Sequence, residues 1–363
     1  AALVAANGYP VERHEVTTED GYILTLFRIP HGRGHSSTSS SPLLLMHGLM
    51  CSSDCWVLPI PEKGLGYILA DAGYDVWIGN NRGNTYSRHH VKLRTNDPQF
   101  WDYSFHEMGY YDLPAVIDYI LNYTGRRQIK YVGHSQGTTQ YFIMASTKPK
   151  YNSKVSVVSA LAPVAYLEQA KGVGYILAKS MPLLDKISRL LGVHCLFDHT
   201  PFDSLIDRLF CRENSIFQPI CQGVVFLIAG FDSPQLNQTL MLQVGQYCPT
   251  GASIKQLMHF RQLITNGKFT QYDYGVVKNL IRYKSFHPPE YDLNLVTTPV
   301  YLHYSQEDYL ARPKDVERLA KVLPASSAYE VPYKQFNHVD YMWATDVNEL
   351  LYSTVLKILK CYD

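Results

Sequence analysis

The stretch IKYVGHSQGTTQYFIMA, residues 129–145, decides the fold that this sequence predicts. Its first part is typical of a strand and its last part of a helix, and a G-x-S-x-G pattern joins the two. Such a turn lifts the hydroxyl of Ser135 to the carboxyl end of the strand. The alternative is a glycine-serine turn that only connects a strand to a helix. The strand-turn-helix setting favours a nucleophile elbow, in which Gly133, His134 and Gly137 surround Ser135 and the glycines let backbones approach closely.

Strands and helices alternate on both sides of this stretch. The predicted strands are residues 15–18, 22–29, 43–46, 74–79, 155–161, 299–304 and 328–331, and the predicted helices are residues 67–72, 112–123, 313–323 and 347–359. The run at residues 43–46 is continuously apolar, which is typical of a strand buried on both faces of a parallel sheet. The alternation therefore predicts an α/β fold with a mostly parallel central sheet and helices on both faces.

Residues 166–295 interrupt this alternation. Apolar residues at helical spacing predict an amphipathic helix pair between residues 173 and 191, and only residues 224–228 are typical of a central strand. We therefore expect a mostly helical insertion into one domain rather than a second, separate domain. The chain would then consist of a core, residues 1–165 and 296–363, and a cap or lid, residues 166–295.

The composition of the 363-residue chain excludes several classes of protein. Its 33 Lys and Arg residues against 32 Asp and Glu residues give a net charge of +1, which argues against a nucleic-acid partner. Hydrophobic residues make up 46% of the chain, too many for a disordered protein. No uninterrupted apolar stretch approaches the ~18 residues that a bilayer requires, so we expect no transmembrane anchor. These features leave an enzyme or a binder of apolar ligands, of undefined oligomeric state.

Cysteines and glycosylation sequons indicate an oxidising compartment. Four of the seven cysteines lie between residues 195 and 248, which favours a disulfide. The N-x-[ST] pattern makes Asn122 and Asn237 candidate glycosylation sites and favours secretion. Cys51 and Cys55 have no second pair at zinc-like spacing, so we expect no metal site.

A serine hydroxyl becomes a good nucleophile only when a histidine accepts its proton and a carboxylate orients that histidine. In an α/β-hydrolase the acid and then the histidine follow later in the chain, each in a loop after a strand. His338 lies just beyond the predicted strand 328–331 and is the candidate base. Glu307 and Asp308 both follow the predicted strand 299–304; position favours Asp308 and leaves Glu307 open.

An oxyanion hole in this setting requires two backbone N–H groups. One is the N–H of Gln136, the residue after the nucleophile. The other comes from the loop after an early strand, where the segment His47-Gly48-Leu49 supplies the N–H of Leu49. The alternative is that His47 and Gly48 form only a turn.

Stretches that span nearly the whole chain match the pattern of a known family. They are GYPVERHEVTTEDGYILTLFRIP from Gly8, HGL from His47, LADAGYDVWIGNNRGNT from Leu69, YVGHSQGTT from Tyr131, ALAPVA from Ala160, GKF from Gly267 and FNHVDY from Phe336. On these residues the sequence resembles the acid lipase family, which includes the gastric and lysosomal acid lipases. The resemblance implies an α/β-hydrolase fold and a secreted or lysosomal protein.

The resemblance also implies an activity, the hydrolysis of ester bonds in neutral lipids (triacylglycerols, sterol esters or both) at a lipid–water interface. It implies Ser135 as nucleophile, His338 as base and Asp308 as acid, which decides against Glu307. Leu49 and Gln136 match the oxyanion donors, residues 166–295 match the cap with its lid, and no cofactor is required. The alternatives are a carboxylesterase or thioesterase acting on smaller esters, and a lipid carrier that has lost activity. A carrier has no need of all three catalytic side chains.

One departure from the family concerns the disulfide of the cap. Cys221 matches one of its cysteines, whereas Ala229 stands at the partner position. Cys195, Cys211 and Cys248 are the alternative partners for Cys221.

Overall fold

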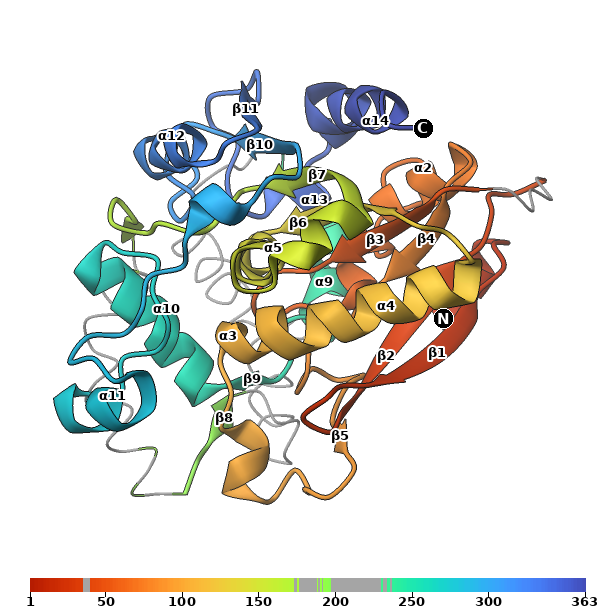
Figure 1. Ribbon diagram of the computed structural model, residues 1–363. Coiled ribbons are helices and arrows are strands. Elements are labelled where there is room, and N and C mark those ends of the chain that lie inside the picture. Colours follow the sequence, from red (N-terminus) through yellow and green to blue (C-terminus); the bar gives the residue numbers. More distant parts are fainter. Residues whose placement is uncertain are drawn as a thin grey trace, which may run out of the picture.

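Figure 1 shows the computed structural model of the chain, which describes residues 1–34, 40–172, 175, 188, 190, 192–196, 230, 234–235 and 237–363. The expected strand at residues 224–228 lies outside the described residues, as do Cys211, Cys221 and Ala229. Most of the helix pair expected between residues 173 and 191 lies outside them as well.

A nine-stranded sheet forms the centre of the described part of the molecule (Figure 1). Its strands are β1 (Glu12–Thr17), β2 (Tyr22–Ile29), β3 (Pro42–Met46), β4 (Asp75–Ile78), β5 (His89–His90), β6 (Ile129–His134), β7 (Val155–Leu161), β10 (Val300–Tyr304) and β11 (Ser326–Glu330). They lie in the order β1-β2-β4-β3-β6-β7-β10-β11, and β5 pairs with β2. All neighbours from β4 to β11 are parallel, whereas β2 is antiparallel to β1, β4 and β5. The prediction of a mostly parallel sheet is confirmed.

The middle of the sheet is covered on both faces. Every residue of β3, β4 and β6 is buried, and successive side chains of a strand point to opposite faces. Helices α4 (Leu113–Thr124) and α5 (Gln136–Thr147) cross in front of the sheet in Figure 1. Helix α2 (Leu65–Asp71) contacts β4, α12 (Pro313–Val322) contacts β10, and α14 (Ser353–Lys360) contacts β7.

Helix ends follow the signals in the sequence. Helix α4 carries Pro114 in its first turn and ends at Gly125, which has a φ of 66° and therefore suits a residue without a Cβ. Helix α12 likewise begins at Pro313. Two π-helical turns were not predicted, η3 (Met108–Asp112) before α4 and η7 (Asn348–Tyr352) before α14.

Strand β11 begins two residues earlier than the sequence predicts. It is the edge strand of the sheet, and most of its residues are exposed, so no apolar pattern marks where it starts. The remaining short elements of the core are α1 (Ala2–Ala6), η1 (Ser53–Trp56), η2 (Pro98–Trp101), α3 (Phe105–Glu107), η4 (Pro149–Lys154) and α13 (Asp340–Trp343), and η6 (Leu293–Leu295) lies at the end of residues 166–295.

The described part of residues 166–295 is mainly helical. It contains α9 (Gln238–Tyr247), α10 (Ile254–Asn266) and α11 (Val276–Tyr283), and a two-stranded sheet of β8 (Cys195–Leu196) and β9 (Ala252–Ser253). Before this region the chain leaves the sheet at β7, and after it the chain returns at β10, which pairs with β7 through Val158 and Val300. The strands on either side of residues 166–295 therefore belong to one sheet.

Candidate active site

Ser135 lies on a strained turn between β6 and α5. Its φ of 51° and ψ of −117° are rare for a residue with a side chain, and such a backbone costs roughly 1–3 kcal/mol. Hydrogen bonds hold the turn on both sides. The Ser135 N–H donates to Leu161 O at 3.0 Å, and the Thr138 N–H and hydroxyl donate to Ser135 O at 2.9 and 2.6 Å. The surrounding structure therefore keeps the serine in this conformation.

The two glycines of the motif permit close backbone approach. A Cβ on Gly133 would come within 2.9 Å of the carbonyl carbon of Gly137 and 3.0 Å of the Thr138 nitrogen. A Cβ on Gly137 would overlap the carbonyl oxygen of Met46 in β3. Any larger residue at either position would push the elbow away from the neighbouring backbone.

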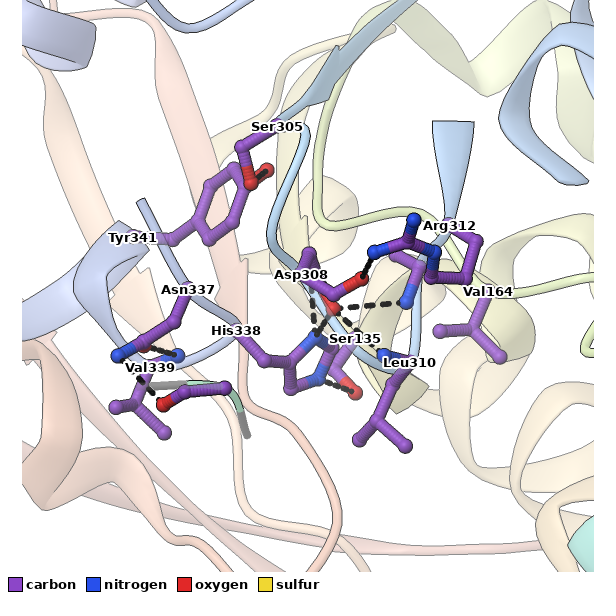
Figure 2. Close-up of polar contacts among 12 residues, drawn as sticks. Ser135, Val164, Ser305, Asp308, Leu310, Arg312, Asn337, His338, Val339 and Tyr341 are labelled. Carbon is purple, nitrogen blue, oxygen red and sulfur yellow. Dashed lines mark hydrogen bonds and ion pairs between the residues drawn. The ribbon is translucent and has the colours of Figure 1, made fainter. Parts of the chain in front are cut away.

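Ser135, His338 and Asp308 form a continuous hydrogen-bonded chain (Figure 2). His338 Nε2 lies 2.8 Å from Ser135 Oγ, and His338 Nδ1 lies 2.9 and 3.0 Å from the two carboxylate oxygens of Asp308. Because a carboxylate only accepts, Nδ1 carries the proton and Nε2 is free to accept from the serine hydroxyl. All three residues are buried, and Asp308 is fully so.

The loop after β10 determines which carboxylate reaches the histidine. Asp308 Oδ1 accepts from the N–H groups of Leu310 and Ala311 at 2.8 and 2.9 Å. Arg312 adds a hydrogen bond from Nη1 to the carbonyl oxygen of Asp308 at 3.2 Å. These bonds aim Asp308 at His338, whereas Glu307 is half-buried and is not the residue bonded to the imidazole.

The loop after β11 holds His338 through groups that the sequence analysis did not single out. Asn337 donates from Nδ2 to Gly230 O at 3.1 Å, and its Oδ1 accepts from the Val339 N–H at 2.9 Å. The Asn337 N–H in turn donates to Asp340 Oδ2 at 2.6 Å. Asp340 therefore braces the backbone of the loop. The pattern N-x-x-D in this loop was the available signal for this local network.

His134 fixes the backbone of His338. Its Nε2 lies 2.8 Å from the carbonyl oxygen of His338, to which it donates. Burial, together with the smaller effect of the neighbouring His338, lowers the pKa of His134 to about 4. His134 is therefore neutral over most of the pH range and holds the loop without adding charge to the site.

The segment His47-Gly48-Leu49 lies directly against the serine. A Cβ on Gly48 would be 3.1 Å from Ser135 Cβ and 3.0 Å from His134 Nδ1, so a side chain there would press on both residues. His47 Nε2 accepts from the Asn81 N–H at 3.1 Å, which leaves Nδ1 to donate to the carbonyl oxygen of Gly48 at 2.8 Å. This bond fixes the Gly48–Leu49 peptide, whose N–H is the expected oxyanion donor.

Gln136, the other expected donor, begins α5 directly after Ser135. Its side chain is buried and its Oε1 accepts from Gln256 Nε2 of α10. This contact joins the residue after the serine to a helix of the insertion, and spacing in the sequence gave no sign of it.

The remaining site predictions concern the surface and metals. Asn122 is exposed on α4, and Asn237 is exposed at the start of α9, where its Oδ1 accepts from the Leu240 N–H at 3.0 Å. Among the described residues, no cluster of His, Cys, Asp and Glu side chains could hold a metal ion. None of the described helices is both long and apolar enough to cross a membrane.

Comparisons with known proteins agree with this geometry. Residues 1–59 match the family model of the partial alpha/beta-hydrolase lipase region, and residues 41–181 match that of the alpha/beta hydrolase fold. Lipase 3 of Drosophila melanogaster is 40% identical over 362 residues, covering 98% of this chain and 91% of the relative. Gastric triacylglycerol lipase of Homo sapiens is 38% identical over 356 residues, covering 97% of this chain and 88% of the relative.

The chain belongs to the acid lipase family.

Solved structures support the fold of this acid lipase. A thermophilic esterase from Thermogutta terrifontis superposes with a TM-score of 0.56 at 13% identity, over 97% of this chain and 100% of that chain. A putative lipase from Acinetobacter baumannii superposes with a TM-score of 0.56 at 14% identity, over 100% of this chain and 96% of that chain. The predicted α/β-hydrolase fold is confirmed, and membership of the family makes the protein an ester hydrolase.

Proposed function

We propose that this acid lipase hydrolyses the ester bonds of neutral lipids, triacylglycerols or sterol esters, with Ser135 as nucleophile. The observation that carries the proposal is the hydrogen-bonded chain from Ser135 Oγ through the imidazole of His338 to Asp308. The name of the human relative, a triacylglycerol lipase, supports a lipid substrate for this chain as well.

Acylation begins when Ser135 Oγ attacks the ester carbonyl and His338 Nε2 accepts the hydroxyl proton. The imidazolium that forms is stabilised by Asp308, which also keeps the proton on Nδ1 in the resting state. The tetrahedral intermediate then collapses as His338 returns its proton to the leaving alcohol. The product of this half-reaction is an acyl-Ser135 ester.

The negative charge of the tetrahedral intermediate falls between two backbone N–H groups, those of Leu49 and Gln136. The close contact of Gly48 with Ser135 and the position of Gln136 at the start of α5 support this assignment. Each such donor contributes roughly 3 kcal/mol to the stability of the transition state.

Deacylation repeats the same chemistry with water. His338 accepts a proton from the water molecule that attacks the acyl ester, and it then returns the proton to Ser135 Oγ as the fatty acid leaves. The protein's own side chains carry every proton transfer in this scheme, so the mechanism needs no cofactor.

Substitution of the nucleophile tests the proposal. Ser135→Ala should lower kcat on any carboxylic ester by at least about 10⁴-fold, because no other group supplies the acyl acceptor. The matched control is Ser153→Ala, an exposed serine of η4, which should keep wild-type kcat. A serine-directed phosphonate should label Ser135 in the wild type and in the control. Ester hydrolysis at the wild-type rate by Ser135→Ala would falsify the mechanism.

Helix α11 provides a surface suited to a lipid–water interface. Val277 and Ile281 are 72% and 68% exposed, and Leu280 lies with them on the outer side of the helix. The inner side is fixed to the protein by the buried Asn279, which donates to Asp273 Oδ1 at 2.7 Å. The exposed apolar side chains therefore belong to a helix that is firmly attached.

Basic side chains accompany this apolar face. Lys278, Arg282 and Lys284 are exposed on the same helix and at its end. An amphipathic helix with apolar and basic side chains is suited to bind the surface of a lipid phase that carries anionic fatty acids or headgroups. We propose that α11 contacts this surface while the ester enters the site.

Residues 166–295 would act as the cap of the active site, and the protein would be secreted or lysosomal. The contact of Gln256 with Gln136 supports a cap seated beside the nucleophile. The exposed side chains of Asn122 and Asn237 are accessible to the glycosylation machinery of the secretory pathway. Treatment of the secreted protein with a peptide N-glycosidase should convert Asn122 and Asn237 to Asp, a mass change that peptide mapping detects.

A further inference from the structure

Three thiols meet directly behind the expected oxyanion hole. Cys51 lies two residues after Leu49, Cys55 lies in η1, and Cys248 lies at the end of α9. The sulfur atoms of Cys51 and Cys248 are 3.5 Å apart, and the thiol of Cys55 forms a hydrogen bond with that of Cys51. The proposed mechanism uses none of these three residues, and of the three only Cys248 is also a candidate partner for Cys221 in the cap.

The backbone around Cys51 and Cys248 is held in place. The Thr250 N–H donates to Met50 O, and the Thr250 hydroxyl donates to Cys51 O, both at 2.8 Å. These bonds bind the segment after α9 to the loop that carries the expected oxyanion donor. A disulfide has an S–S length of about 2.05 Å, so the two sulfur atoms need to approach by about 1.5 Å, within the reach of side-chain rotation.

The electrostatic surroundings make Cys51 the nucleophile of the three. Hydrogen bonds from the thiols of Cys248 and Cys55 lower the pKa of Cys51 well below the usual value. The pKa of Cys248 is raised, mainly by its hydrogen bond to Cys51. The pKa of Cys55 is raised, mainly by burial.

We propose that Cys51 and Cys248 form a disulfide that joins the oxyanion loop to the end of α9. In the oxidising compartment the electron acceptor is a disulfide such as glutathione disulfide. The Cys51 thiolate attacks one of its sulfur atoms and releases one glutathione thiolate. Cys248 then loses its proton to solvent and attacks Cys51 Sγ, which releases the second. Two protein thiols are oxidised, and one small disulfide is reduced to two thiols.

Cys55 is the competing partner, and its place in the loop disfavours it. A Cys51–Cys55 bond would close a ring of only five residues across the start of η1. That start is already fixed, because Ser52 Oγ accepts from the Asp54 N–H at 3.2 Å and Ser52 O accepts from the Cys55 N–H at 3.3 Å. Bonding to Cys55 would distort this turn, whereas bonding to Cys248 leaves the backbone in place.

The consequence of the bond is a covalent link between core and insertion. Cys51 and Cys248 are 197 residues apart in the sequence, so the bond restricts a long stretch of the unfolded chain and raises stability. It also holds Met50, whose φ of 57° is strained, next to Leu49. The effect on the position of Leu49 matters only if the proposed function is correct, whereas the disulfide itself does not depend on that function.

Peptide mapping tests the bond independently of activity. The full chain is equilibrated with glutathione disulfide, the remaining thiols are blocked with N-ethylmaleimide, and the protein is digested without reduction. We expect a cross-linked peptide that joins Cys51 to Cys248, with Cys55 carrying the blocking group. The control Cys361→Ser, which removes an exposed thiol at the C-terminus, should give the same map. A Cys51–Cys55 peptide, or Cys51 found blocked, would overturn the proposal.

Thermal unfolding provides the second readout. Oxidation should raise the Tm of the wild type by several degrees, about 5 °C or more, and dithiothreitol should reverse the rise. Cys248→Ser should make the rise smaller, whereas Cys55→Ser should keep it in full. An equal Tm for the oxidised and reduced wild type, or a rise in Cys248→Ser as large as in the wild type, contradicts the link between core and insertion.

Discussion

In the proposed mechanism, Asp308 sets which nitrogen of His338 carries the proton. Asp308→Asn would keep the hydrogen bonds from Leu310 and Ala311, but its amide N–H would donate to Nδ1 and move the proton to Nε2. The imidazole could then no longer accept from Ser135. We expect kcat on a soluble ester to fall about 10⁴-fold, as for the corresponding change in a serine protease, with an unchanged Tm. The matched variant Glu307→Gln should keep wild-type kcat; loss of activity in that variant instead would reassign the acid.

Gly48 places the proposed oxyanion loop against Ser135, and a methyl group there should separate the two. In Gly48→Ala the new Cβ would press on Ser135 Cβ and His134 Nδ1. Because the N–H of Leu49 would move with the loop, we expect kcat to fall about 10²-fold with little change in KM. Gly245→Ala in α9 is the control, since open space surrounds that position and alanine favours the helix. Equal kcat values for the two variants would remove Leu49 from the mechanism.

The sequence predicted the order Ser135, acid, His338, because each of these residues follows a strand that can be recognised from its pattern of apolar residues. Position favoured Asp308 and the family resemblance decided for it, but position alone left Glu307 open, since that choice depends on how the loop folds back onto the N–H groups of Leu310 and Ala311. The buried parallel strands at the centre of the sheet could also be predicted from the sequence. The exposed edge strand β11 began at a different residue from the prediction, because exposure removes the apolar signal.

Helix α11 presents an apolar outer face to water. Ile281→Glu should weaken the contact with a lipid surface, since it places a charge in the middle of that face. We expect activity on an emulsified long-chain ester to fall about tenfold, while kcat on a soluble short-chain ester stays unchanged. Val91→Glu, at another exposed apolar residue, serves as the control and should leave both activities intact. A parallel loss on both substrates would indicate damage to the fold rather than to interfacial binding.

At the scale of the whole molecule, buried histidines link stability to pH. Burial lowers the pKa of His303 and of His134 to about 4, and that of His259 to about 3. In the unfolded chain these groups take up protons near pH 6.5, whereas in the folded chain they resist protonation. Their contribution to stability is therefore complete above pH 6.5 and is lost as the pH falls toward 4, by on the order of 2–3 kcal/mol each.

His303→Leu tests this account, because the side chain lies inside β10 and burial alone shifts its pKa. We expect the free energy of unfolding of this variant to fall less steeply between pH 6.5 and pH 4 than that of the wild type, by about 2 kcal/mol over the interval. His287→Leu, at an exposed histidine, should follow the wild-type slope. The measurement is urea unfolding at a series of pH values, and identical slopes for His303→Leu and the wild type would contradict the prediction.

The order of the strands has a consequence for how the protein is made. Ser135 follows β6, whereas Asp308 follows β10 and His338 follows β11. Strand β10 pairs with β7, and β11 pairs with β10 at the edge of the sheet. In the proposed mechanism, a growing chain that has left the ribosome as far as residue 300 holds the nucleophile without its base. We therefore expect the lipase to stay inert during almost all of its own synthesis, so that the membranes of the producing cell meet an active enzyme only after the last strands have been translated and paired.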